Sequence, residues 1–160
     1  MKEQLKVVIS CGGTGGHIFP AIATADALKR QYPNTEILFI GALGRMEMDR
    51  VPKAGYPIKG LWISGLQLDK SIFSLPFKLI KSLKDARNIL KEFHPDVVVG
   101  FGGFASGPTL KAANWLHIPT VIQEQNSFLA RPTAMSAKKP KPFASPMKKW
   151  TNGFLKNAST

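Results

Sequence analysis

Short apolar runs alternate with longer amphipathic segments over the first 123 residues of the chain. The short runs are rich in valine and isoleucine and end in glycine or polar residues, which is typical of parallel strands buried on both faces. They predict strands at Leu5–Ser10, Ile37–Ile40, Ile58–Ile63, Asp96–Gly100 and Pro119–Gln123.

The longer segments carry apolar residues at helical spacing. They predict helices at Ala21–Tyr32, Arg45–Val51, Ile72–Phe93 and Pro108–Leu116. Pro20 directly precedes the first of them, and proline is tolerated in the first turn of a helix. Alternation in this order predicts an α/β fold, a Rossmann-like parallel sheet with helices on both faces, and sites at the carboxyl ends of the strands.

Composition is that of a globular protein, with an anomaly at one end. Hydrophobic residues make up 44% of the 160 positions, and the formal net charge is +12. Residues 1–128 hold 15 Lys and Arg against 10 Asp and Glu, whereas residues 129–160 hold 7 and none. Four of the 12 prolines also lie in the second range, without apolar periodicity, which predicts a disordered basic tail.

Cysteine content and hydropathy bear on the compartment. The single Cys11 excludes an internal disulfide framework and favours a reducing compartment. No uncharged stretch approaches the roughly 20 apolar residues of a membrane-spanning helix. We therefore expect any membrane contact to be peripheral.

The segment CGGTGGHIFP, Cys11–Pro20, joins the first predicted strand to the first predicted helix. Backbone N–H groups and the helix dipole attract an anion at such a position, and glycines let the backbone approach a phosphate. Ile18 stands where the dinucleotide fingerprint has its last glycine, and no Walker lysine follows. A purely structural turn is the alternative at this stage.

Two further strand ends carry glycine or polar chemistry. Gly100–Pro108, GFGGFASGP, is a second glycine-rich turn, and Gln123–Asn126, QEQN, supplies one carboxylate and three amides. The carboxyl ends of parallel strands meet at one edge, so we expect a two-sided anion cradle there. The amides could instead cap loops.

His17 and Glu124 are the candidates for proton transfer. Histidine is suited to general-base catalysis near neutral pH or to phosphate binding, but it could equally bond a neighbouring loop at the helix N-terminus. Which of the two side chains moves the proton is open. We expect Cys11 to pack in the interior and His94 and His117 to lie at helix ends, and no pair has metal-ligand spacing.

Five segments match a known family in order and spacing: GGTGGHIFPAIATADAL, LGRMEMDRVPKAGYPI, ISGL, PDVVVGFGGFASGP and IPTVIQEQNS. They resemble the N-terminal domain of the MurG family of peptidoglycan N-acetylglucosaminyltransferases, from about Lys6 to Phe128. The resemblance implies half of a GT-B glycosyltransferase without a cofactor, acting on the cytoplasmic face of the plasma membrane. The implied reaction transfers N-acetylglucosamine from UDP-N-acetylglucosamine to undecaprenyl-diphosphate-linked N-acetylmuramoyl-pentapeptide, turning lipid I into lipid II.

The resemblance also implies residue roles. The implied catalytic residues are His17, as general base for the acceptor hydroxyl, and Glu124. The implied donor contacts are Thr14, Gly15, Gly16 and Asn126. The acceptor diphosphate would be cradled by Gly12, Gly13, Gly102 and Gly103. Two positions depart from the family, which often has Tyr at Phe104 and His at Gln123.

The segment SIFSLPFKLIKSLK, Ser71–Lys84, places apolar residues beside Lys78, Lys81 and Lys84. An apolar patch with basic neighbours suits an anionic membrane surface, and we expect peripheral binding through about residues 72–84. The alternative is that these apolar residues belong to the core.

The chain departs from the family abruptly after Phe128, inside a motif. A permitted coding of KPKPFASPMKKW, which begins at Lys139, reads AKTICVAYEKM in a displaced frame, and the family carries an apolar strand of this type here. We therefore expect residues 129–160 to be an out-of-frame, disordered reading. We expect the acceptor domain, 1–128, to be incomplete at its C-terminus, the donor domain to be absent, and the chain alone to show little turnover.

Other functional classes fit less well. A non-catalytic membrane-surface or acceptor-binding module would need a separate donor domain. Nucleic-acid binding would rest almost wholly on the charge of residues 129–160, so we expect no nucleic-acid partner. A nicotinamide dehydrogenase lacks its third glycine.

Overall fold

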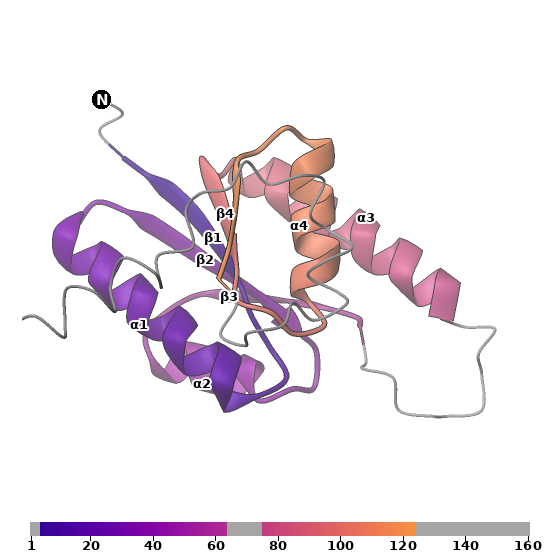
Figure 1. The fold of residues 1–160 in the computed structure, drawn as a ribbon, viewed down its shortest axis with the longest axis horizontal. Helices are drawn as coiled ribbons and strands as arrows, with labels where there is room; N and C mark the ends of the chain where they lie inside the picture. The colour runs from indigo at the N-terminus through magenta and orange to yellow at the C-terminus, as the bar shows by residue number, and fades with distance from the viewer. Residues whose placement is uncertain (1–3, 64–74, 124–160) are drawn as a thin grey trace, which may run out of the picture.

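The computed structural model describes residues 4–63 and 75–123, which form a parallel sheet between two layers of helices (Figure 1). The strands are β1 (Lys6–Ser10), β2 (Glu36–Ala42), β3 (Ile58–Leu61), β4 (Val97–Gly100) and β5 (Thr120–Ile122). Their spatial order is β3-β2-β1-β4-β5, and all neighbours are parallel. The α/β class and all five predicted strands are confirmed.

Four helices in residues 4–63 and 75–123 cover the sheet: α1 (Gly15–Gln31), α2 (Glu47–Lys53), α3 (Leu75–Phe93) and α4 (Ser106–Trp115). Helices α1 and α2 lie on one face, and α3 and α4 lie on the other (Figure 1). No helix in the described ranges is long and apolar enough to cross a membrane.

The core that the described residues form consists of two apolar clusters, because successive side chains of a strand point to opposite faces. Val8 of β1 packs with Leu90 and Leu110 on the side of α3 and α4. Its neighbours Val7 and Ile9 pack with residues of α1 and α2 on the other side. Both faces need apolar side chains, which explains the continuous apolar runs of the strands.

Helix α1 begins earlier than its sequence suggests. The prediction placed its start at Ala21, with Pro20 at the entrance, but the helix starts at Gly15 and includes Pro20. The first-turn interpretation of Pro20 was therefore wrong. Since proline has no N–H, the carbonyl of Gly16 lacks its helical donor, and the exposure of Gly16 allows water to replace it.

Helix α3 contacts the sheet through the second half of its length. Ala86 and Leu90 are buried, whereas Leu79, which helical spacing places on the same side of α3, is 46% exposed. Figure 1 shows the first turns of α3 extending beyond the sheet.

Two histidines lie at the ends of helices, as the sequence predicts. His94 and His117 follow α3 and α4 with φ of 53° and 57°, the left-handed conformation that ends many helices. The interpretations that concern residues 129–160, and the segment 64–74, fall outside the described residues.

Candidate functional site

The first glycine turn, Gly12–Gly16, connects the central strand β1 to α1. Thr14 is the N-cap of α1 and is extended, with φ −144° and ψ 156°. Gly13 has φ +88°, a conformation that residues with side chains rarely adopt. The first-turn N–H groups of a helix lack helical acceptors and carry the positive end of its dipole, so this turn suits an anion.

His17 belongs to the first turn of α1, and its ring points back to the glycine turn that precedes the helix. Its Nδ1 is 3.2 Å from the Thr14 hydroxyl and 3.2 Å from the carbonyl oxygen of Gly12. A carbonyl oxygen can only accept, so a hydrogen bond to Gly12 requires a proton on Nδ1. The neutral ring then has its lone pair on Nε2.

The second glycine turn, which follows β4, reaches the first turn. Gly102 and Gly103 have φ of +91° and +84°. A Cβ atom added to Gly102 would lie 2.9 Å from Nε2 of His17. One added to Gly103 would overlap the carbonyl oxygen of Gly12. Glycine at both positions therefore allows the two turns to touch.

Hydrogen bonds fix the second turn to the central strand. The hydroxyl of Ser106, at the start of α4, donates toward the carbonyl oxygens of Ser10 (2.9 Å) and Gly102 (2.7 Å). The N–H of Phe101 donates to the same Ser10 carbonyl over 2.8 Å. The carboxyl ends of β1 and β4 are thus held in one arrangement.

The third strand end is described as far as Gln123. Its N–H donates to the carbonyl oxygen of Gly100 over 2.9 Å, which continues the pairing of β5 with β4. Glu124 and Asn126 lie outside the described residues. The structure thus brings together the predicted site residues of the two glycine turns, which are Gly12, Gly13, Thr14, Gly15, Gly16, His17, Gly102 and Gly103.

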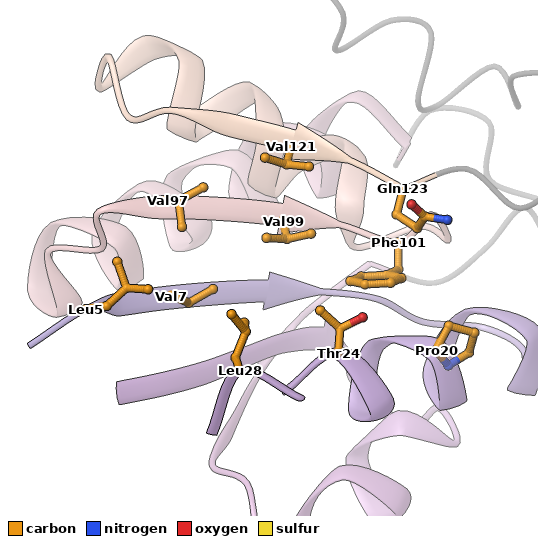
Figure 2. Close-up of a pocket in the computed structure, with 10 residues that line it drawn as sticks. All are labelled: Leu5, Val7, Pro20, Thr24, Leu28, Val97, Val99, Phe101, Val121 and Gln123. Carbon is orange, nitrogen blue, oxygen red and sulfur yellow. The ribbon is translucent and has the colours of Figure 1, made fainter. Parts of the chain in front are cut away.

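An apolar groove of about 490 Å³ lies beside α1, over β1, β4 and β5 (Figure 2). Figure 2 shows Phe101 and Gln123 at the end nearer the glycine turns and Leu5 at the opposite end. None of the ten residues that line this groove carries a charge. An anionic group therefore suits the glycine turns better than the groove.

Cys11 is fully buried beneath the first turn. Burial, and secondarily the nearby charge of Glu47, raise the pKa of its thiol from 9.0 to about 12. The thiol is therefore protonated at neutral pH and is no nucleophile. The expectation that Cys11 packs in the interior is confirmed. In the described ranges, no group of three or more His, Cys, Asp or Glu side chains is arranged to hold a metal.

Sequence reasoning missed Glu47, which is fully buried. Its carboxylate accepts the N–H of Gly13 over 3.1 Å and the N–H of Ala42 over 2.9 Å. Both partners are backbone groups, so no complementary charge in the sequence reveals the contact. The only signal was the position of Glu47 within a segment that resembles a known family.

The chain is similar in sequence to a known family and to several of its members. Residues 7–144 match the family described as Glycosyltransferase family 28 N-terminal domain. The UDP-N-acetylglucosamine--N-acetylmuramyl-(pentapeptide) pyrophosphoryl-undecaprenol N-acetylglucosamine transferase of Christiangramia forsetii is 62% identical over 130 residues, 80% of this chain and 36% of that protein. The protein of the same name from Phocaeicola vulgatus is 57% identical over 142 residues, 87% of this chain and 38% of that one.

A solved structure is similar as well. The crystal structure of Acinetobacter baumannii MurG has a TM-score of 0.74 and 32% sequence identity, and the match covers 86% of this chain and 40% of that chain. The chain thus spans less than half the length of the relatives it matches.

Proposed function

The chain belongs to the family of glycosyltransferase family 28 N-terminal domains, and from this premise we propose that it forms the acceptor-binding half of a GT-B enzyme of peptidoglycan synthesis. The reaction is transfer of N-acetylglucosamine from UDP-N-acetylglucosamine to the undecaprenyl-diphosphate-linked N-acetylmuramoyl-pentapeptide. The observation that carries the proposal is the contact between the two glycine turns, with His17 between them.

The acceptor diphosphate binds over these two turns, in the space left open where Gly12, Gly13, Gly102 and Gly103 have no side chains. Backbone N–H groups at a helix start can hold a diphosphate without a metal, because their dipoles are fixed before the ligand arrives. The glycines allow this approach because no Cβ atom covers the backbone. The groove beside α1, being uncharged, is left to apolar contacts.

His17 acts as the general base through Nε2. The acceptor hydroxyl oxygen forms a bond to C1 of N-acetylglucosamine, the bond from C1 to the UDP oxygen breaks, and UDP leaves with the electron pair. The hydroxyl proton passes to Nε2, which is free to accept it when Nδ1 donates to Gly12. Glu124 is the alternative base and otherwise a polar group of the same site.

The donor site is shared with a second domain. Thr14, Gly15 and Gly16, which belong to the turn under the acceptor diphosphate, also contact UDP-N-acetylglucosamine at the edge of the cleft, together with Asn126. Most of the nucleotide binds to a donor domain beyond residues 1–128, so catalysis requires both halves of the cleft.

The first turns of α3 hold the domain on the cytoplasmic face of the membrane. Ile80 is 65% exposed, and Trp62, which follows β3, is 49% exposed. The ammonium groups of Lys78 and Lys81 lie 5.7 and 4.8 Å from the centre of the Trp62 ring. Exposed apolar groups with cations around them favour an anionic lipid surface.

Acceptor binding can be tested on the 160-residue chain. The ligand is a water-soluble lipid I analogue, a short prenyl diphosphate that carries N-acetylmuramoyl-pentapeptide, and calorimetry measures its Kd. We expect Gly102→Ala to weaken binding at least tenfold, because the new Cβ would meet His17.

The matched control is Gly55→Ala. Gly55 has φ +88°, close to that of Gly102, but it lies in open space outside the site, so its variant has the backbone strain alone. We expect this variant to bind like the unsubstituted chain. Absence of binding by the unsubstituted chain, or equal binding by Gly102→Ala, would contradict the proposed function.

A further inference from the structure

We propose that Glu47 is a positioning residue that fixes the first glycine turn. It holds the turn so that the N–H groups of Gly15 and Gly16, and not that of Gly13, meet the acceptor diphosphate. The inference rests on the proposed function for the identity of the ligand. Its structural basis is a buried carboxylate beneath the turn, on a helix from which sequence reasoning expected no functional residue.

The carboxylate bridges two segments by accepting backbone N–H groups. Oε2 accepts the N–H of Gly13 over 3.1 Å, and Oε1 accepts the N–H of Ala42, at the end of β2, over 2.9 Å. Hydrogen bonds to a charged acceptor are among the stronger ones in proteins. Glu47 therefore ties the turn after β1 to the neighbouring strand.

The space for this side chain is made by two glycines. A Cβ atom on Gly12 would overlap Oε1 of Glu47. A Cβ atom on Gly41 would lie 2.5 Å from Cγ of Glu47. Gly12 belongs to the first turn and Gly41 to β2. A larger residue at either position would occupy the space that the Glu47 side chain fills.

The contact decides which donors face outward. With φ +88°, Gly13 directs its N–H to Glu47 inside the protein. The N–H groups of Gly15 and Gly16, in the first turn of α1, have no acceptor within the helix and are available to a ligand. The diphosphate is thereby directed to the start of α1 and to the second turn.

Glutamine cannot replace this carboxylate. The side-chain amide has a single acceptor oxygen, and its NH₂ group would face one of the two backbone N–H groups. Glu47→Gln thus keeps the size of the side chain and loses one end of the bridge. Asp49→Asn is the matched control, because it removes the same charge from the same helix, where Asp49 is exposed and paired with Lys53.

The first experiment uses geranyl diphosphate as probe, with the 160-residue chain and NMR of its backbone amides. We expect the probe to shift the Gly15 and Gly16 signals, Glu47→Gln to raise the Kd at least tenfold, and Asp49→Asn to change it less than twofold. Urea unfolding verifies that both variants are folded. A folded Glu47→Gln variant that binds as tightly as the unsubstituted chain would overturn the inference.

A second measurement needs no substitution. Hydrogen exchange of the unsubstituted chain should show the Gly13 amide protected equally with and without probe, whereas the Gly15 and Gly16 amides gain protection at least fivefold on binding. Protection of Gly13 that appears only with the probe would assign its N–H to the phosphate and reject the positioning role. Failure of the unsubstituted chain to bind the probe at all would instead reject the diphosphate site itself, and the functional role of Glu47 with it.

Discussion

At the scale of single residues, the site depends on glycines, because they have no Cβ atom. Gly103 approaches the backbone of Gly12, and Gly102 faces the ring of His17, because neither has a Cβ atom. Beneath them, Glu47 and Cys11 are fully buried side chains that hold and fill the space under the first turn. Among the described residues of the two turns, backbone amides, the Thr14 hydroxyl and the His17 imidazole are the groups left to contact a ligand.

The buried thiol of Cys11 predicts a dependence of stability on alkaline pH. Its pKa is about 12 in the folded chain against 9.0 for a free thiol, so above pH 9 the unfolded chain releases this proton first. The free energy of unfolding should therefore fall as pH rises from 9 towards 12, by up to about 1.4 kcal/mol per pH unit from this group. Urea unfolding at several pH values measures it.

The comparison variant for this prediction is Cys11→Ala. Lysine and tyrosine titration affects both chains, so the difference between their slopes isolates the thiol. The variant should lose less stability per pH unit above pH 9. Parallel slopes for the two chains would show that the thiol does not titrate in this manner.

Sequence reasoning succeeded at the residues whose signal is local. Consecutive glycines after an apolar run placed both turns, and His17 stood at a helix start. Glu47 escaped because its partners are amides of Gly13 and Ala42, which any sequence would provide. The role of a residue that binds backbone groups becomes visible only when the strands are brought together.

At the scale of elements, the strands were easier to predict than the helix starts. Runs such as VVI and VVV have one interpretation, since parallel strands are buried on both sides. The start of α1 was misplaced by six residues, because glycine is a poor helix former and Pro20 suggested an entrance. The helix nonetheless begins at Gly15, where the turn contacts fix its direction.

The proline within α1 predicts a stabilising substitution. In Pro20→Ala the new N–H can reach the carbonyl of Gly16, so we expect the free energy of unfolding to rise by about 1–2 kcal/mol. Pro33→Ala is the control: Pro33 is exposed and outside the helices, so only the freedom of the unfolded chain changes, which lowers stability slightly. Urea unfolding measures the stability of both variants. A Pro20→Ala chain that is less stable than Pro33→Ala would refute the explanation.

The start of α3 predicts lipid binding. Replacing Lys78 and Lys81 with alanine should weaken binding to vesicles that contain phosphatidylglycerol by about 30-fold, because each cation near such a surface contributes about 1 kcal/mol. Replacing Lys29 and Arg30, at the end of α1 on the other face, removes the same charge and should have a smaller effect. Equal effects in a flotation assay would mean that net charge, and not this helix, governs binding.

At the scale of the whole molecule, the strands of the sheet differ in how well neighbouring strands and helices cover them. Strand β1 is paired on both sides and covered on both faces, whereas β5 ends the order of the described strands and its Val121 is 49% exposed. Both glycine turns follow the better supported strands, β1 and β4. The site therefore rests on the centre of the sheet.

This distribution predicts the pattern of native hydrogen exchange. The amides of Val8 and Ile9 should exchange only on global unfolding, and that of Val121 at least tenfold faster through local opening. Exchange followed by NMR at low urea concentrations separates the two processes. Equal rates at β1 and β5 would indicate that the sheet opens as one unit.

The pairing of β1 has a consequence for how the protein is made. Val8 pairs with Leu38 on one side and with Val98 on the other. At the start of the second pairing, the N–H of Asp96 donates to the carbonyl of Lys6, and the N–H of Lys6 donates to the Asp96 carboxylate. Lys6 and Asp96 are 90 positions apart in the sequence. Contacts between distant positions form slowly, so we expect β4 to dock after β1, β2 and β3 have paired. The two glycine turns would meet only at that step, so we expect a newly synthesised chain to acquire its secondary structure before it acquires its site.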